Sequence, residues 1–259
     1  MSEKAWLQSG SEEIVGESAA LNAALASAKR LAASDAAVLI VGERGSGKEL
    51  FARVIHRMSP RRNNSFVQVN CVTTAGDRLE RQLFGYEKGA FEGAISDKIG
   101  GLKMADKGTL FLNEIARFPP DLQPKLVRVL KRGEFERLGD TRVIRVNVRL
   151  IAATRCRPEK IADDRLQRAL HCFGDLFDRS SIQIPPLRER REDIPLLARY
   201  FMRKFARRIN KDIETIAPEI IDALQNNDWP GNVTQLENFI QRSVIFTEGS
   251  RLQAPLDEL

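Results

Sequence analysis

Residues 38–49 read Val38-Leu39-Ile40-Val41-Gly42-Glu43-Arg44-Gly45-Ser46-Gly47-Lys48-Glu49, and this stretch decides the fold. Its first four residues are apolar and mostly β-branched, which is typical of a buried strand. A glycine-rich turn follows, and from Glu49 onward apolar residues recur at helical spacing. A strand, a glycine-rich loop, a lysine and a helix form the phosphate cradle of P-loop proteins, because the loop N–H groups and the positive end of the helix face the same anion. The alternative is a chance glycine-rich turn between a strand and a helix.

We therefore predict that a nucleotide, ATP with Mg²⁺, binds this loop and that Lys48 reaches its β- and γ-phosphates. One residue departs from the general pattern, because Glu49 occupies the position at which Ser or Thr usually contacts magnesium. The predicted nucleotide-binding residues are Gly42, Glu43, Arg44, Gly45, Ser46, Gly47, Lys48 and Glu49.

The run Gly108-Thr109-Leu110-Phe111-Leu112-Asn113-Glu114 predicts a central strand with polar side chains at its C-terminal end, where ligands bind in open α/β sheets. In P-loop ATPases this position holds an Asp that binds magnesium and a neighbouring Glu that polarises the attacking water. Glu114 fits the second role. Asn113 fills the first with a neutral amide, whose oxygen still accepts a hydrogen bond but brings no charge to the metal. We expect weaker magnesium binding and slower hydrolysis, with nucleotide binding less affected.

Composition and charge exclude several classes of protein. The chain is 42% hydrophobic and 29% charged, as in soluble globular proteins, and no apolar run approaches the length of a transmembrane helix. The N-terminus lacks a signal-peptide pattern, so we expect a cytoplasmic protein without membrane contact. The cysteines and histidines lack metal-site spacing. The net charge of +6 suits a polyphosphate ligand or a nucleic-acid-bound assembly, but it is too small and dispersed to predict a DNA site.

The order of elements predicts an α/β fold, a P-loop doubly wound parallel sheet of five strands. The expected strands are 38–41, 66–70, 108–114, 146–154 and 181–185. Beyond Pro186 no strand pattern appears, and helices are expected at 194–209, 218–226 and 233–246. We place an α/β nucleotide-binding domain at residues 1–186 and a small helical lid domain at residues 187–259. The charged residues 187–193, which begin the lid, suggest by composition a solvated surface.

The hexapeptide Gly89-Ala90-Phe91-Glu92-Gly93-Ala94 surrounds one aromatic side chain with residues too small to bury it locally. Such a loop tip is expected to project Phe91 as an apolar anchor toward a partner. The alternative is a flexible connection in which Phe91 folds back.

Several stretches, read together, resemble one family closely: the central AAA+ domain of sigma-54-dependent transcriptional activators, the bacterial enhancer-binding proteins. The resemblance covers nearly the whole chain in the family's order, and Glu49 after the P-loop lysine is itself a feature of the family. The stretches that carry the resemblance are 14–18, 42–49, 83–91, 108–112, 185–190 and 229–233.

The resemblance implies an α/β ATPase with a helical lid, which assembles into a ring, usually a hexamer, with ATP between subunits. It also implies a partner, the sigma-54 RNA polymerase holoenzyme, contacted by loop 89–94 and remodelled through hydrolysis. By the same resemblance, Arg179 is the arginine supplied to the ATP of the neighbouring subunit. No DNA-binding domain is expected within this chain.

The sequence departs from the family pattern at several functional positions. Glu92 replaces the threonine of the partner loop, and Asn113 replaces the metal-binding aspartate. Arg155 follows Thr154 where the family has asparagine, and Thr234 replaces the lid arginine. Of the two arginines that the family supplies to a neighbour, only the one at Arg179 has a match. Loss of one such arginine lowers turnover by orders of magnitude.

Two predictions of function follow. The chain is either an ATP-driven regulator with impaired hydrolysis, which relies on Lys48, Glu114 and Arg179, or a non-catalytic nucleotide-binding module that co-assembles with an intact AAA+ partner. A third alternative is an unrelated AAA+ remodeller such as a helicase loader. Loop 89–94 and residues 185–190 argue against the third.

Overall fold

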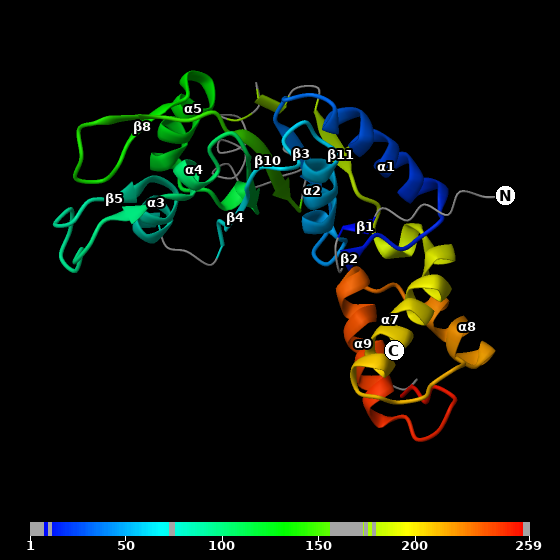
Figure 1. The fold of residues 1–259 in the computed structure, drawn as a ribbon. Helices are drawn as coiled ribbons and strands as arrows, with labels where there is room; N and C mark the ends of the chain where they lie inside the picture. Colours follow the sequence, from blue (N-terminus) through cyan, green and yellow to red (C-terminus); the bar gives the residue numbers. More distant parts are fainter. Residues whose placement is uncertain are drawn as a thin grey trace. The chain divides into compact units, whose positions relative to one another are not determined.

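A computed structural model of the chain describes residues 8–9, 12–72, 76–155, 173, 176–177 and 180–255. The chain forms two compact units (Figure 1). One unit contains the described residues up to Ala26, the segment Gly42–Leu50 and the described chain from Ile184 onward. The other unit contains Ser27–Val41 and the described part of Phe51–Gln183.

The second unit is built on a five-stranded parallel sheet. Its order from edge to edge is β11 (Ser181–Gln183), β3 (Val38–Val41), β10 (Arg149–Thr154), β7 (Thr109–Asn113) and β4 (Phe66–Asn70). The predicted doubly wound sheet is therefore confirmed. Its first strand along the chain, β3, lies between its fourth and fifth, so the loop after β3 leaves the sheet where the strand order reverses. In open α/β sheets ligands bind at this point.

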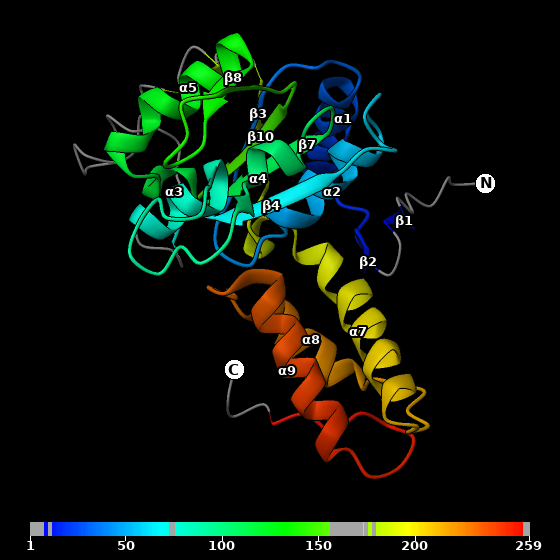
Figure 2. The same ribbon diagram turned by 60° about the vertical axis from the view of Figure 1, so that its left-hand side comes forward.

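Packing on both faces explains why the middle residues of the central strands are apolar. All residues of β3 and β10 are buried, as expected of strands covered by helices on both sides. Helices α3 (Gly76–Phe84) and α5 (Gln123–Arg132) share one core with strands of the sheet (Figure 2). The side chains that pack in this core include Leu79, Leu83, Leu110, Leu112, Leu126, Val129, Leu150 and Ala152.

The second unit also carries two hairpins. Helix α3 ends at Phe84 because Gly85 adopts φ +77°, and β5 (Gly85–Tyr86) pairs with β6 (Lys98–Ile99). The short helix α4 (Gly101–Met104) follows. The second hairpin consists of β8 (Glu134–Glu136) and β9 (Val143–Arg145).

Helices α7 (Ile194–Arg208), α8 (Pro218–Asn226) and α9 (Asn232–Phe246) form the lid, as predicted (Figures 1 and 2). They surround their own apolar core, in which Trp229 is 1% exposed and contacts the ring of Phe239. No named strand follows β11 in the part of the chain described.

Four further elements precede or follow β3, the first strand of the large sheet along the chain. Strands β1 (Gln8–Ser9) and β2 (Glu12–Glu13) form a short antiparallel pair. Helix α1 (Ala19–Ala32) begins after Ser18, whose hydroxyl accepts a hydrogen bond from the N–H of Leu21 at 3.3 Å and so caps the helix. Helix α2 (Lys48–Arg57) begins at the lysine of the glycine-rich loop.

Candidate functional site

The glycine-rich loop adopts a conformation that only its glycines reach at little cost. Gly45 and Gly47 have φ of +76° and +101°, in the left-handed region that other residues rarely adopt. The N–H of Ser46 donates to the carbonyl of Glu43 at 3.2 Å, which closes the turn. A Cβ at Gly47 would meet nothing within 4 Å, so the space beside this glycine is open. The loop thus has the curled backbone and the room that a phosphate cradle requires.

Two polar side chains of the loop are buried at this turn. Lys48 is 7% exposed, and its ammonium group donates to the carbonyls of Gly42 at 2.8 Å and Glu43 at 3.0 Å. The hydroxyl of Ser46 is buried without a hydrogen-bond partner among the described residues. A buried polar atom without a partner costs stability, and an anion in the loop would supply an acceptor for it. The residues present therefore fit a polyphosphate.

Asn113 and Glu114 lie at the C-terminal edge of the sheet. Asn113 ends β7 and is level with Ala153 of β10, while Thr154 is level with Val41, the residue before the glycine-rich loop. Glu114 follows with φ 59° and ψ 51°, an uncommon left-handed conformation that turns the chain out of the strand. Such strain at a strand end is often found at functional sites.

The carboxylate of Glu114 is paired with a residue that the sequence showed as a departure. The Nε of Arg155 donates to Oε1 of Glu114 at 3.1 Å, and the Glu114 side chain is 12% exposed. Burial, with the charge of Glu114 as a smaller cause, raises the pKa of the nearby Cys71 thiol to about 12. Among the described residues no group of three His, Cys, Asp or Glu side chains has the arrangement of a metal site.

Loop 89–94 holds its aromatic side chain close to the body of the same unit. The ring of Phe91 packs edge-on against Tyr86, with centroids 4.9 Å apart, and the guanidinium carbon of Arg81 lies 3.6 Å from its centroid. The N–H of Gly89 donates to the carbonyl of Ala94 at 2.9 Å and closes the loop. Of the two alternatives for Phe91, the ring therefore folds back in this structure. The apolar side chain that points to solvent is Ile95, which is 83% exposed.

The charged start of the lid is only in part the solvated surface that composition suggested, because Arg188, Glu189 and Glu192 are exposed whereas two other charged residues are buried. Arg190 and Asp193 are 3% and 1% exposed. The carboxylate of Asp193 accepts bonds from the N–H groups of Glu17 and Ser18 at 2.7 and 2.8 Å and from the Ser18 hydroxyl at 2.7 Å. These partners are far away in the sequence, so local composition gave no indication of them.

Two further residues named in the sequence analysis are Thr234 and Arg179. The N–H of Thr234 donates to the carbonyl of Gly45 at 3.4 Å, so this position contacts the glycine-rich loop through its backbone. Arg179 lies outside the described residues.

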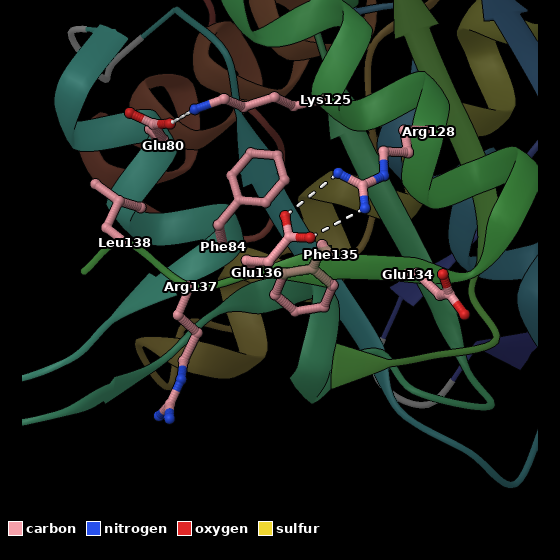
Figure 3. Close-up of a pocket in the computed structure, with 9 residues that line it drawn as sticks. All are labelled: Glu80, Phe84, Lys125, Arg128, Glu134, Phe135, Glu136, Arg137 and Leu138. Carbon is pink, nitrogen blue, oxygen red and sulfur yellow. Dashed lines mark hydrogen bonds and ion pairs between the residues drawn. The ribbon is translucent and has the colours of Figure 1, made fainter. Parts of the chain in front are cut away.

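A pocket of about 200 Å³ opens between α3, α5 and β8 (Figure 3). Its apolar side chains are Phe84, Phe135 and Leu138. Figure 3 shows the charged residues at its rim paired with each other, Lys125 with Glu80 and Arg128 with Glu136. None of the residues predicted from the sequence as site residues lines it. Paired charges give a ligand no free partner, so this pocket does not explain the function.

The family of the chain follows from its sequence and its fold together. Residues 14–178 match the Sigma-54 interaction domain, and residues 188–256 match an AAA+ ATPase lid domain. The chain belongs to the sigma-54-dependent activator family. The resemblance inferred from the motifs is thus confirmed. No helix in the part of the chain described is long and apolar enough to cross a membrane.

Relatives include the formate hydrogenlyase transcriptional activator FhlA of Escherichia coli, which is 48% identical over 250 residues. That alignment covers 95% of this chain and 35% of FhlA. A Nif-specific regulatory protein of Bradyrhizobium diazoefficiens is 46% identical over 92% of this chain and 40% of its own length. The chain thus spans about two fifths or less of these relatives.

Solved structures of other proteins have the same fold. The crystal structure of NtrX from Brucella abortus in complex with ATP superposes with a TM-score of 0.81 at 36% identity, covering 94% of this chain and 54% of NtrX. An ADP complex of Saccharomyces cerevisiae Hsp104, with a TM-score of 0.55 at 18% identity, shares the fold alone; that alignment covers 86% of this chain and 43% of the Hsp104 chain.

Proposed function

We propose that this chain is the nucleotide-binding domain of a sigma-54-type transcription regulator, which binds ATP in the loop 42–49 and hydrolyses it slowly. The observation that carries the proposal is the loop itself, with left-handed Gly45 and Gly47, open space at Gly47 and a buried Lys48 at the start of a helix. The NtrX structure with ATP, from a relative of the same fold, supports the choice of nucleotide.

In this proposal the loop N–H groups and Lys48 bind the phosphates and neutralise their charge. Lys48 exchanges its contacts with the loop carbonyls for the β- and γ-phosphates. Glu114 orients a water for attack on the γ-phosphorus; the bond to the β-phosphate oxygen breaks, ADP leaves, and the proton of the water passes to solvent. Arg179 of a neighbouring subunit stabilises the charge that develops. Mg²⁺ would be held by the phosphates, with the neutral amide of Asn113 as a weak ligand.

Slow hydrolysis is supported by the pairing of Arg155 with Glu114. A carboxylate that accepts a hydrogen bond from a guanidinium has fewer lone pairs available to orient water. The neutral Asn113 adds to this loss. The same two observations favour a second candidate function, a nucleotide-binding subunit without turnover that assembles into a mixed ring with an intact relative.

For the partner we propose sigma-54 RNA polymerase, contacted by loop 89–94 in a ring of subunits. Family membership supports the partner, and the exposure of Ile95 and Glu92 at the loop supports the surface. Glu92 places a carboxylate at the contact, which is costly to bury unless the partner supplies a cation.

The test is steady-state ATP hydrolysis as a function of protein concentration, with Lys48→Ala as the blank. We expect a rate above the blank that rises more steeply than the protein concentration, because active sites shared between subunits need assembly. ATP binding without any turnover above the blank would select the second candidate function. Wild-type ATP affinity no better than that of Lys48→Ala would refute nucleotide binding in the loop.

A further inference from the structure

The lid residues of the first unit hold the side chain of Glu43, the second residue of the phosphate loop. The guanidinium of Arg188 donates two parallel hydrogen bonds to the Glu43 carboxylate, at 2.6 and 2.8 Å. The side-chain amide of Asn232 donates to Oε2 of Glu43 at 3.1 Å and to the carbonyl of Arg44 at 3.1 Å. Such a bidentate pair fixes geometry as well as charge.

Asn232 is itself held rigidly. It is fully buried, and its backbone adopts φ +53°, a left-handed conformation that asparagine tolerates better than most residues. Its side-chain oxygen accepts a hydrogen bond from the N–H of Leu187 at 2.7 Å. Arg190 donates to the carbonyl of Ser46 at 3.2 Å. The loop carbonyls at Arg44 and Ser46 are therefore both bound by lid side chains.

The hydrogen bonds from Arg188 and Asn232 offset the negative charge of Glu43. A carboxylate beside a phosphate site repels the negatively charged ligand. Glu43 is ionised at neutral pH, because the hydrogen bonds of Arg188, with a smaller contribution from Asn232, lower its pKa to about 2. Arg188 places a positive charge directly on that carboxylate. The lid thus removes an electrostatic penalty from the phosphate loop.

We propose that Arg188 and Asn232 are positioning residues which, with Glu43, form a latch that holds the phosphate loop ready for nucleotide and neutralises its carboxylate. This Glu43–Arg188–Asn232 latch ties the state of the lid to the affinity of the loop. The proposal rests on the proposed function, because it assumes that ATP binds the loop.

The test is a double-mutant cycle with ATP affinity measured by fluorescence of a labelled ATP analogue. Arg188→Gln leaves the carboxylate bare and should raise the Kd about five- to tenfold, the effect expected of a partly exposed ion pair. Glu43→Gln removes the charge and keeps one acceptor oxygen for Arg188, so it should raise the Kd less than Arg188→Gln does. The double variant Glu43→Gln with Arg188→Gln should bind more tightly than Arg188→Gln alone. Purely structural damage by Arg188→Gln would not be repaired by removing Glu43.

The matched control is Lys204→Gln, which removes one lid cation that pairs with Glu237 rather than with the loop. It should leave the Kd unchanged. An Arg188→Gln variant that binds like wild type, or a double variant no better than Arg188→Gln, would overturn the latch while leaving ATP binding intact. If wild type itself binds no better than Lys48→Ala, the proposed function fails instead.

A second readout needs no nucleotide. The amide of Leu187 is protected by the Asn232 side chain, so its hydrogen exchange should accelerate in Asn232→Ala and in Arg188→Gln, which removes the other lid donor to the Glu43 carboxylate. Unchanged exchange of that amide in Arg188→Gln would show that Arg188 does not position Asn232 and would also overturn the latch.

Discussion

The side chain of Arg155 occupies one oxygen of the Glu114 carboxylate, because its Nε donates to Oε1 at 3.1 Å. Arg155→Asn should free Glu114 to orient water and raise ATP turnover about tenfold, the order of gain expected of a released general base. The Kd for ATP should change little, because the phosphate loop is untouched. Single-turnover rates with saturating ATP would measure the chemical step.

Arg117→Asn is the matched control, since Arg117 is an exposed arginine three residues after Glu114 with no side-chain contact among those found in the described chain. It should leave the rate unchanged. If Arg155→Asn is no faster than this control, the ion pair does not limit hydrolysis. The next substitution to test would then be Asn113→Asp, which restores the aspartate of the family pattern.

At the residue scale, the sequence predicted which side chains differ from the family but not what each one contacts. Arg155 was recognisable as a departure after Thr154, yet its ion pair with Glu114 joins positions 41 residues apart. Likewise Arg188 and Glu43 are 145 residues apart, and nothing in either local sequence indicates the pairing. Periodicity and motifs report local structure, whereas such pairs depend on the finished fold.

Whole elements were easier to predict, because apolar periodicity and glycine positions are local. The five strands and the three lid helices follow from such patterns, and α8 spans the predicted residues. The β5–β6 hairpin was not predicted. Each of its strands has only two residues, too few to show an alternation of apolar and polar side chains, and the two strands are separated by loop 89–94. Phe91 was ambiguous for the same reason, because its position depends on Arg81 and Tyr86 in neighbouring elements.

Loop 89–94 and the residue after it yield a prediction about the proposed partner. Ile95 is 83% exposed, so burying it against sigma-54 would contribute about 1.5–3 kcal/mol. Ile95→Ser should therefore weaken binding of labelled sigma-54 at least tenfold in the presence of ATP, as measured by fluorescence anisotropy, without lowering the thermal stability of the chain.

Ile99→Ser provides the comparison, because Ile99 is also exposed, at 62%, but lies in β6 outside the loop. It should bind sigma-54 as wild type does. Loss of binding in Phe91→Ala together with normal binding in Ile95→Ser would mean that Phe91 leaves Tyr86 to meet the partner. The contact surface proposed at Ile95 would then be incorrect.

At the scale of the whole molecule, the two compact units divide the predicted machinery between them. The phosphate loop belongs to the unit that contains the lid, while Asn113, Glu114 and loop 89–94 belong to the unit that contains the sheet. The sequence-based division at residue 186 separates the loop from the lid, and it remains a prediction. The lid contacts to residues 43–46 explain why the loop groups with the lid, and no pattern in the sequence predicts them.

Assembly provides the last prediction, because a ring shares each ATP site between neighbours. Arg179→Ala should bind ATP as wild type does, since its own phosphate loop is intact, but should lose turnover if this arginine serves the adjacent subunit. Lys48→Ala should lose ATP binding while keeping Arg179. Mixed in equal amounts, the two inactive variants should regain part of the wild-type rate, because some sites combine an intact loop with an intact arginine. A mixture as inactive as its components, under conditions in which wild type turns over, would place Arg179 in its own subunit or outside catalysis.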